Sequence, residues 1–266
     1  MKICFITAIY GGYEGSCKRF AQQTVVTDFI CFTDNPHIIS NGWIVDTTPY
    51  HLMNQSKVDN DSYTNSMLNN KHSFNIAKYY KQSFMNIPIL QNYDVVVWVD
   101  GTIEIVYDKT SEYILQNIMK EKIIGWHHED RHGKLSEEVA ASHFERYTST
   151  FWNNQAQPYQ DVDGQYSAYL NEGYTDDYFK NMNSHTCHFG VWITCFVAFL
   201  CKDEDVLRFL DLWYLQTLKY TTQDQIGFPY VCQKTGLIPF TLPNQEVHGS
   251  CPHQHTMFYV KHAHGR

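Results

Sequence analysis

Residues 93–108 read YDVVVWVDGTIEIVYD, and this segment carries the strongest fold signal of the chain. The apolar run VVVWV at 95–99 is followed by one acid, Asp100, and by Gly101. A short unbroken apolar run is typical of a strand buried on both faces, as in a parallel sheet. The alternative is a hairpin, because Asp-Gly between two apolar runs is also a strong turn signal. Asp100 would end a central strand in the first case and sit in a surface turn in the second.

Strand and helix patterns alternate on both sides of this run. Strands are expected within residues 2–12, 27–35, 42–49 and 122–128, and helices within 71–84, 110–121, 134–147, 203–220 and 222–236. The apolar run at 187–201 is expected to form two elements, a strand followed by a second strand or the start of a helix. This alternation predicts an α/β fold with a parallel sheet and crossover helices on both faces.

Three of the expected strands end in polar or glycine-rich sequence. Tyr10-Gly11-Gly12 follows the first strand, Thr33-Asp34 follows the second, and Asp100-Gly101 follows the central one. Ligands of parallel α/β sheets bind beyond the carboxyl ends of the strands, so we expect these segments to meet at one binding edge. The glycines let a ligand approach the backbone closely.

Composition limits the classes of function. The 266 residues contain 20 Lys and Arg against 28 Asp and Glu, a net charge of −8, which argues against nucleic-acid binding and against a basic membrane-binding face. The eight cysteines show no Cys-x-x-Cys spacing, which indicates reduced, buried thiols and a cytoplasmic location. No apolar run reaches the roughly eighteen residues of a transmembrane helix, so any membrane contact is expected to be peripheral.

Charged residues near the expected binding edge are the candidates for chemistry. Asp100 could hold a divalent cation that neutralises a diphosphate. Lys78 and Lys81 lie three apart on an expected helix and could reach phosphates, although a solvated basic face gives the same pattern. Asp224 opens an expected helix that follows an apolar one, and it could take a proton from an acceptor hydroxyl, or could be an acid favoured by the helix dipole.

Two further segments are candidates for contacts with an acceptor or a metal. His128 and Arg131 follow a short strand and could bind an acceptor sugar together with Gln225, although a plain surface loop is equally compatible with the 128–131 sequence. The tail from 242 contains several histidines, and short histidine-rich tails are often incidental. Metal-like composition is found in the tail at Cys251, His253, His255, His262 and His264.

Six motifs occur in order along the chain: ITAIYGGYE, ICFTD, GW, AKYYKQSF, VWVDGTIEI and TQDQIGFPYV. In this order they resemble the glycosyltransferase-like family of plant mucilage-related proteins and of bacterial and viral polysaccharide-cluster proteins. The resemblance spans residues 6–231. It implies a single Rossmann-like domain of the glycosyltransferase A type (GT-A) over 1–266, with a mostly parallel central sheet flanked by helices. The nucleotide-binding half would cover about 1–107, the acceptor-binding half about 108–241, and the tail 242–266.

The resemblance also implies roles for individual residues. The first loop would hold the nucleotide base and ribose, and Asp34 would lie near the base. The residues expected to bind the nucleotide sugar are Thr7, Ala8, Tyr10, Gly11, Asp34, Lys78, Lys81, Asp100 and Gly101. The expected acceptor-binding residues are His128, Arg131 and Gln225, with Asp224 as the catalytic residue.

A metal site follows from the same resemblance, with one departure from the family pattern. Asp100 matches the first acid of an Asp-x-Asp motif that binds Mn²⁺ or Mg²⁺, but Thr102 stands where the second acid is expected. A hydroxyl is a poorer ligand than a carboxylate for either ion. Either Glu104 or a tail histidine would have to complete the site. A histidine is favoured because Glu104 lies further along the strand, and the candidates are His253, His255 and His262.

The expected function is transfer of a sugar from a nucleotide diphosphate sugar, with UDP as the expected nucleotide, to a hydroxyl of a glycan or lipid-linked glycan in polysaccharide biosynthesis. Two alternatives remain at this point. One is a hydrolase of an amide or glycosidic bond that uses Asp100, Asp224 and histidines. The other is a carbohydrate-binding module without catalysis, since aromatic residues make up 15% of the chain.

Overall fold

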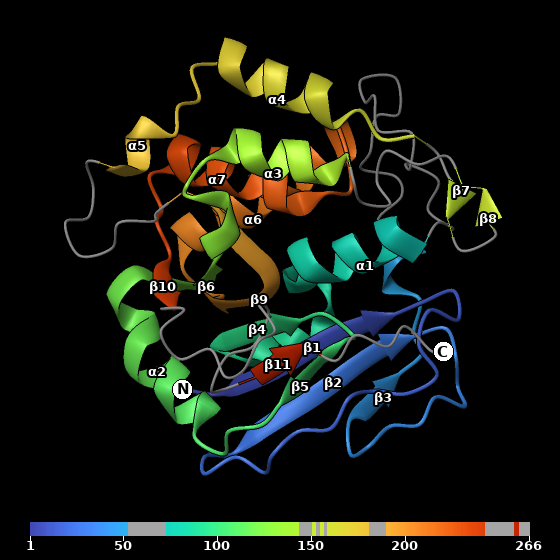
Figure 1. Ribbon diagram of the computed structural model, residues 1–266. Helices are drawn as coiled ribbons and strands as arrows, with labels where there is room; N and C mark the ends of the chain where they lie inside the picture. The colour runs from blue at the N-terminus through green and yellow to red at the C-terminus, as the bar shows by residue number, and fades with distance from the viewer. Residues whose placement is uncertain are drawn as a thin grey trace.

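The computed structural model describes residues 1–52, 73–143, 151–152, 155–156, 159–180, 190–242 and 258–260. A central sheet carries helices on both of its faces (Figure 1). The strands are β1 (Ile3–Ile9), β2 (Thr27–Thr33), β3 (Ile44–Asp46), β4 (Val95–Val99), β5 (Ile103–Ile105), β6 (Ile123–His127), β7 (Phe151–Trp152), β8 (Gln155–Ala156), β9 (Trp192–Leu200), β10 (Phe240–Leu242) and β11 (Phe258–Val260). The α-helices are α1 (Ser73–Gln82), α2 (Thr110–Glu121), α3 (Leu135–Ser142), α4 (Val162–Asn171), α5 (Asp177–Lys180), α6 (Glu204–Lys219) and α7 (Asp224–Thr235). Short 3-10 helices are η1 (Tyr50–Leu52), η4 (Phe84–Asn86), η5 (Pro88–Asn92) and η6 (Glu129–Arg131).

The central sheet is mostly parallel, as the sequence predicts. Its strand order is β10-β6-β9-β4-β1-β2-β3. β1 pairs in parallel with both β2 and β4, whereas β9 runs antiparallel to β4 and β6. All five residues of β4 are buried, because this strand lies between β1 and β9 and both of its faces are covered. The apolar run at 95–99 is therefore a central strand, and the carboxyl ends of β1, β2 and β4 lie at one edge.

The prediction of two elements within residues 187–201 is wrong. Its described part forms one strand, β9, of nine residues, seven of which are buried. The run is apolar at successive positions because β9 lies between β4 and β6 and packs on both faces of the sheet. An apolar run of this length can form one long strand or two shorter elements, and burial in the folded chain decides between them.

The hairpin alternative for Asp100-Gly101 is also wrong. β4 does not pair with β5. The amide of Asp100 donates to the carbonyl of Cys195 on β9 (2.9 Å), and the amide of Ile103 donates back to the carbonyl of Asp100 (2.9 Å). This turn directs the chain out of the central sheet, and β5 pairs instead with β11 from the C-terminal tail. The tail strand thus lies beside the segment that follows Asp100.

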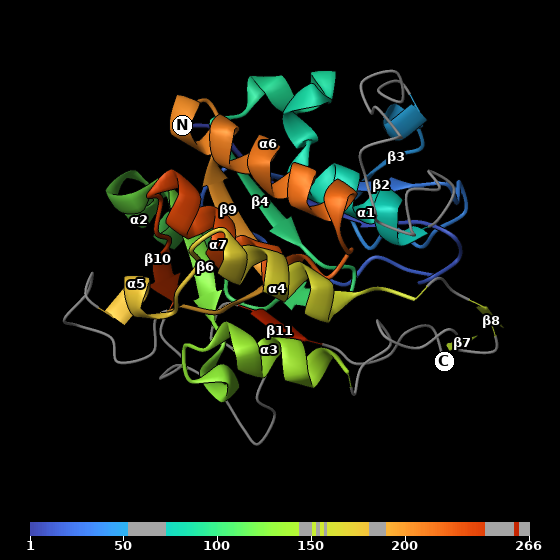
Figure 2. The same ribbon diagram turned by 90° about the horizontal axis from the view of Figure 1, so that it is seen from above.

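The two faces of the sheet hold separate apolar cores. One face packs against α1, α6 and α7, which Figures 1 and 2 show together on one side of the sheet. The other face packs against α2 and β5. β1 contributes side chains to both cores, because its successive residues point to opposite faces. Cys4 and Ile6 belong to the first core, and Ile3 and Phe5 belong to the second. The predicted crossovers on both faces are confirmed, and among the described residues no helix is both long and apolar enough to cross a membrane.

Candidate active site

A pocket lies at the edge where the carboxyl ends of β1 and β4 meet α1. Ala8, Tyr10, Lys78, Asp100 and Gly101 are on its wall. All five were candidates from sequence, and the parallel pairing of β1 with β4 brings the two ends together. This is the position at which α/β sheets bind ligands.

The other residues expected to bind the nucleotide do not line this pocket. Thr7 is buried within β1 and does not line the pocket. The carboxylate of Asp34 accepts the amide of Gly11 at 3.1 Å, and so holds the loop after β1 against the end of β2. Gly11 has a φ of +68°, a conformation that glycine adopts without strain. Asp34 and Gly11 therefore shape the loop instead of lining the pocket.

The aromatic part of the pocket was not singled out from sequence. Tyr13 and Phe74 both line it and contact each other edge to face, with ring centroids 6.2 Å apart. Tyr10 is stacked on Tyr80, and its hydroxyl donates to the Tyr80 hydroxyl at 2.8 Å. Burial and this hydrogen bond raise the pKa of Tyr10 far above its ordinary value, so Tyr10 stays neutral. No spacing rule identifies these rings, because they come from a loop and from a helix.

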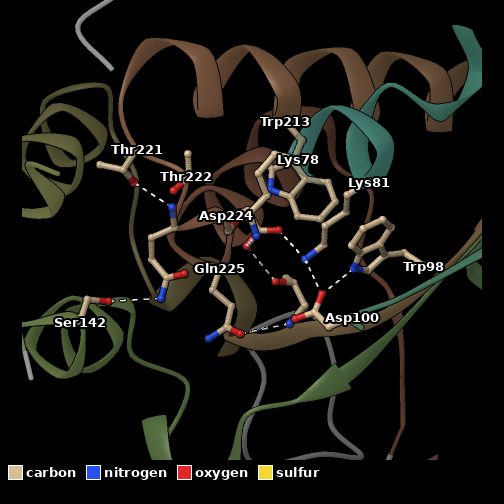
Figure 3. A network of polar contacts seen from close by, with 12 residues as sticks. Lys78, Lys81, Trp98, Asp100, Ser142, Trp213, Thr221, Thr222, Asp224 and Gln225 are labelled. Carbon is tan, nitrogen blue, oxygen red and sulfur yellow. Dashed lines mark hydrogen bonds and ion pairs between the residues drawn. The ribbon is translucent and has the colours of Figure 1, made fainter. Parts of the chain in front are cut away.

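Lys78 and Lys81 of α1 hold the carboxylate of Asp224, the first residue of α7 (Figure 3). Lys78 Nζ lies 2.8 Å from Oδ1 of Asp224, and Lys81 Nζ lies 2.5 Å from Oδ2. The hydroxyl of Thr194 also donates to Oδ1 (3.2 Å). Asp224 is 4% exposed and the Lys81 side chain 1%, so Lys81 is no part of a solvated basic face. The two lysines share a helix face, as their spacing predicts.

Lys81 also connects Asp224 to Asp100. Its Nζ is 3.9 Å from Oδ1 of Asp100 and lies over the rings of Trp98 and Trp213, at 5.6 and 5.5 Å from their centroids. Trp98 Nε1 donates to Oδ1 of Asp100 at 2.7 Å (Figure 3). The sequence offered one signal for this last contact: Trp98 and Asp100 are two residues apart at a strand end, so both project to the same side.

The electrostatic state of Asp224 follows from its neighbours. Burial by itself raises the pKa of this carboxyl, but the charges of Lys78 and Lys81 outweigh burial and leave the pKa below its ordinary value. Asp224 is therefore ionised at neutral pH. With both oxygens held by lysines, it is a weak proton acceptor in this arrangement.

The three predicted acceptor residues converge on Glu138 of α3. Arg131 Nε donates to Oε2 of Glu138 at 2.7 Å, and His128 Nε2 lies 3.7 Å from the same oxygen. Gln225 Nε2 donates to Oε1 at 2.8 Å. Sequence analysis missed Glu138, although its place on the buried stripe of α3, between Leu135 and Val139, is unusual for an acid.

The described residues supply few metal ligands. The Asp100 side chain is 43% exposed, and its Oδ2 accepts no hydrogen bond from the part of the chain that the structure describes. Glu14 is the second carboxylate on the pocket wall and is paired with Lys18 at 3.1 Å. In the described ranges no group of three or more His, Cys, Asp or Glu side chains could hold a metal ion. His253, His255 and His262 lie outside the described residues.

Comparisons with known proteins support the fold. No protein-family model and no curated protein sequence matches this chain. Among solved structures, the chain is similar to the crystal structure of mouse xyloside xylosyltransferase 1 in its apo form, with a TM-score of 0.54 and 6% sequence identity. The match covers 98% of this chain and 97% of the mouse chain. At this identity the likeness concerns the fold alone, which does not single out the family named from the sequence motifs. The chain, with its mostly parallel sheet flanked by helices, thus shares its α/β fold with that structure.

Proposed function

We propose that this protein is a glycosyltransferase that moves a sugar from a nucleotide diphosphate sugar to a hydroxyl of a glycan acceptor. The observation that carries the proposal is the cluster of Lys78, Lys81, Asp224 and Asp100 beside a pocket at the carboxyl ends of β1 and β4. The glycosyltransferase fold adds support. Positioning and electrostatic stabilisation are what such a transfer needs from the protein.

The pocket has two parts that match the two parts of such a donor. Tyr13 and Phe74 offer apolar ring surface for a base, and Lys78 with Asp100 forms the charged part for the diphosphate. Lys78 is the better placed of the two lysines, because it lines the pocket and its side chain is 16% exposed. A lysine ammonium binds phosphate as a point charge.

The transfer breaks the bond between the anomeric carbon and the diphosphate oxygen, and the nucleoside diphosphate leaves with the electron pair. The acceptor oxygen forms the new bond to that carbon, and its hydroxyl proton must pass to a base. We propose that Lys78 turns toward the bound diphosphate and leaves Oδ1 of Asp224 to the acceptor hydroxyl. Loss of the Lys78 contact would raise the pKa of Asp224, because the charge of Lys78 is one of the causes that lower it.

A divalent cation fits this site only in part. Asp100 provides one exposed carboxylate, and Thr102 on the same pocket wall provides a hydroxyl. We propose that further ligands come from the diphosphate and from a tail histidine, since β11 of the tail pairs with β5 just after Asp100. Such a cation, Mn²⁺ or Mg²⁺, would neutralise charge on the leaving diphosphate.

The first test is release of UDP from a panel of UDP-sugars, with and without acceptor. UDP-xylose with p-nitrophenyl β-xyloside is the first pair, because the mouse structure is named as a xyloside xylosyltransferase; UDP-glucose, UDP-galactose and their matching glycosides follow. Acceptor-dependent release of UDP together with a new glycoside supports transfer. Glycoside cleavage without donor would instead assign a hydrolase, and saturable glycan binding without turnover would assign a binding module.

A further inference from the structure

We propose that Glu138 is a positioning residue that couples the His128–Arg131 segment to Asp224. Its carboxylate contacts both glutamines that flank Asp224, and it also holds Arg131. The inference rests on the proposed function, because its consequence is an effect on the acceptor half of the transfer. Nothing in the sequence patterns assigned a role to this residue.

The contacts of Glu138 occupy both carboxylate oxygens. Oε1 accepts Gln223 Nε2 at 3.0 Å and Gln225 Nε2 at 2.8 Å. Oε2 accepts Arg131 Nε at 2.7 Å. The side chain is 3% exposed, whereas that of Arg131 is 21% exposed. Glu138 thus joins three elements, η6, α3 and the start of α7, at one buried point.

A continuous path leads from Glu138 to the carboxylate of Asp224. Gln225 uses its amide nitrogen for Glu138 and its amide oxygen to accept the backbone amide of Thr194 on β9, at 3.2 Å. The Thr194 hydroxyl then donates to Oδ1 of Asp224. In Figure 3, Asp224 and Gln225 extend from the start of α7, and the Asp224 carboxylate points toward the ammonium groups of Lys78 and Lys81. Loss of the Glu138 contact would therefore remove one of the two contacts that orient Gln225, and the other is to Thr194, whose hydroxyl holds Asp224.

Stability alone does not explain an acid at this position. A buried carboxylate is costly to desolvate, and replacing a buried ion pair with apolar residues is often neutral or stabilising. The neighbours of Glu138 on the buried stripe of α3 include Leu135 and Val139, so an apolar side chain would suit the same face. What the carboxylate adds is orientation, because it accepts three donors in fixed directions.

Arg131 gives this cluster an open side toward the solvent. Its Nε donates to Glu138 and its side chain is 21% exposed, and a guanidinium has further N–H donors that can bind hydroxyl groups. An acceptor held by Arg131 would be linked through Glu138 to the residues that flank Asp224. We therefore expect loss of Glu138 to impair acceptor use and to spare donor binding.

The test compares Glu138→Gln with Glu137→Gln. Glu137 is the preceding residue of the same helix, is 34% exposed and pairs with His132 at 2.8 Å, so it is a matched surface control. The probes are UDP for binding and, for turnover, the UDP-sugar and p-nitrophenyl glycoside that the wild type uses best. We expect Glu138→Gln to lower kcat/KM for the acceptor at least tenfold, with the Kd for UDP changed less than twofold. Glu137→Gln should stay within twofold of the wild type in both.

A double variant separates positioning from stability. Glu138→Gln leaves Arg131 without the carboxylate it pairs with and is expected to lower the Tm. The double variant Arg131→Gln/Glu138→Gln removes both charges and should regain part of the lost Tm. If the double variant regains both Tm and acceptor kcat/KM, the role is only structural and the inference is wrong. Equal acceptor kinetics in Glu138→Gln and wild type would also overturn it. If the wild type itself releases no UDP with any donor and acceptor, the proposed function fails first, and the inference fails with it.

Discussion

Replacing Asp224 with asparagine should destabilise the fold strongly, because this carboxylate lies between two ammonium groups. Lys81 is 1% exposed, and Asp224 is the one carboxylate within 3 Å of its Nζ among the described residues. Asp224→Asn takes the nearest carboxylate away from this buried ammonium, and the other carboxylate near it, Asp100, is 3.9 Å away and 43% exposed. Removing one partner of a buried ion pair costs about 3–5 kcal/mol. For a chain of this size, that corresponds to a fall in Tm of roughly 6–20 °C.

A second substitution shows whether the cost comes from the charge. Lys81→Met keeps an apolar side chain between the Trp98 and Trp213 rings and leaves Asp224 paired with Lys78. It should cost less than Asp224→Asn, about 1–3 kcal/mol. The double variant removes both charges and should be no less stable than Asp224→Asn alone. The cycle should therefore yield an attractive coupling energy of at least about 1 kcal/mol.

The assays are urea unfolding and thermal unfolding of the wild type, both single variants and the double variant at pH 7, each followed by far-UV circular dichroism. Equal slopes with urea would show that the unfolded states are comparable. Two results would refute the reasoning. One is a Tm for Asp224→Asn within about 2 °C of the wild type. The other is additivity of the two substitutions within about 0.5 kcal/mol, the value expected for independent sites.

Three further predictions concern the same cluster. Asp100→Asn should abolish turnover that depends on Mn²⁺. Because Asp100 is 43% exposed, the substitution should change the free energy of unfolding by no more than about 0.5 kcal/mol. Activity of the wild type in EDTA would contradict the metal role. Lys78→Met should raise the Kd for UDP at least fivefold in isothermal titration calorimetry, whereas Lys134→Met, a surface control with a 55% exposed side chain, should leave it unchanged. In the folded state the pKa of Asp224 lies below its ordinary value of 3.8. Its ionised form therefore stabilises the fold above pH 3.8, and this stabilisation is lost as the pH falls through the lower pKa of the folded state. The difference in unfolding free energy between the wild type and Asp224→Asn should accordingly narrow only below pH 3.8.

The sequence was most informative where local pattern and burial agree. The unbroken apolar run at 95–99, followed by Asp100-Gly101, predicted a central strand and a polar edge, because a strand covered on both faces has no solvent-facing position. The spacing of Lys78 and Lys81 predicted a shared helix face, and the structure brings both to Asp224. That these residues meet an acid 143 or more positions away could not be read from local spacing, because α1 and α7 meet only through packing on the sheet.

Other features depend on contacts that no pattern encodes. The β5–β11 pairing joins residues more than 150 positions apart, and a strand of three residues carries too little periodicity to indicate its partner. Glu138 falls between Leu135 and Val139 on the buried stripe of α3, but the sequence does not show which donors its carboxylate meets. The family resemblance placed Asp34 near the base. Its observed bond to the Gly11 amide is a property of the loop, whose course depends on the left-handed glycine.

The charges around the pocket set the order of events that binding must follow. Lys78 and Lys81 carry two positive charges and Asp100 and Asp224 two negative ones, so the cluster offers a diphosphate no net attraction as it stands. Either a cation joins, or a lysine exchanges its carboxylate partner for phosphate. Lys81 lies between two indole rings and is 1% exposed, whereas Lys78 lines the pocket and its side chain is 16% exposed. The exchange at Lys78 is therefore the less costly step, and it uncovers Asp224 Oδ1 only once the donor is bound. An acceptor hydroxyl that needs this oxygen must then enter second.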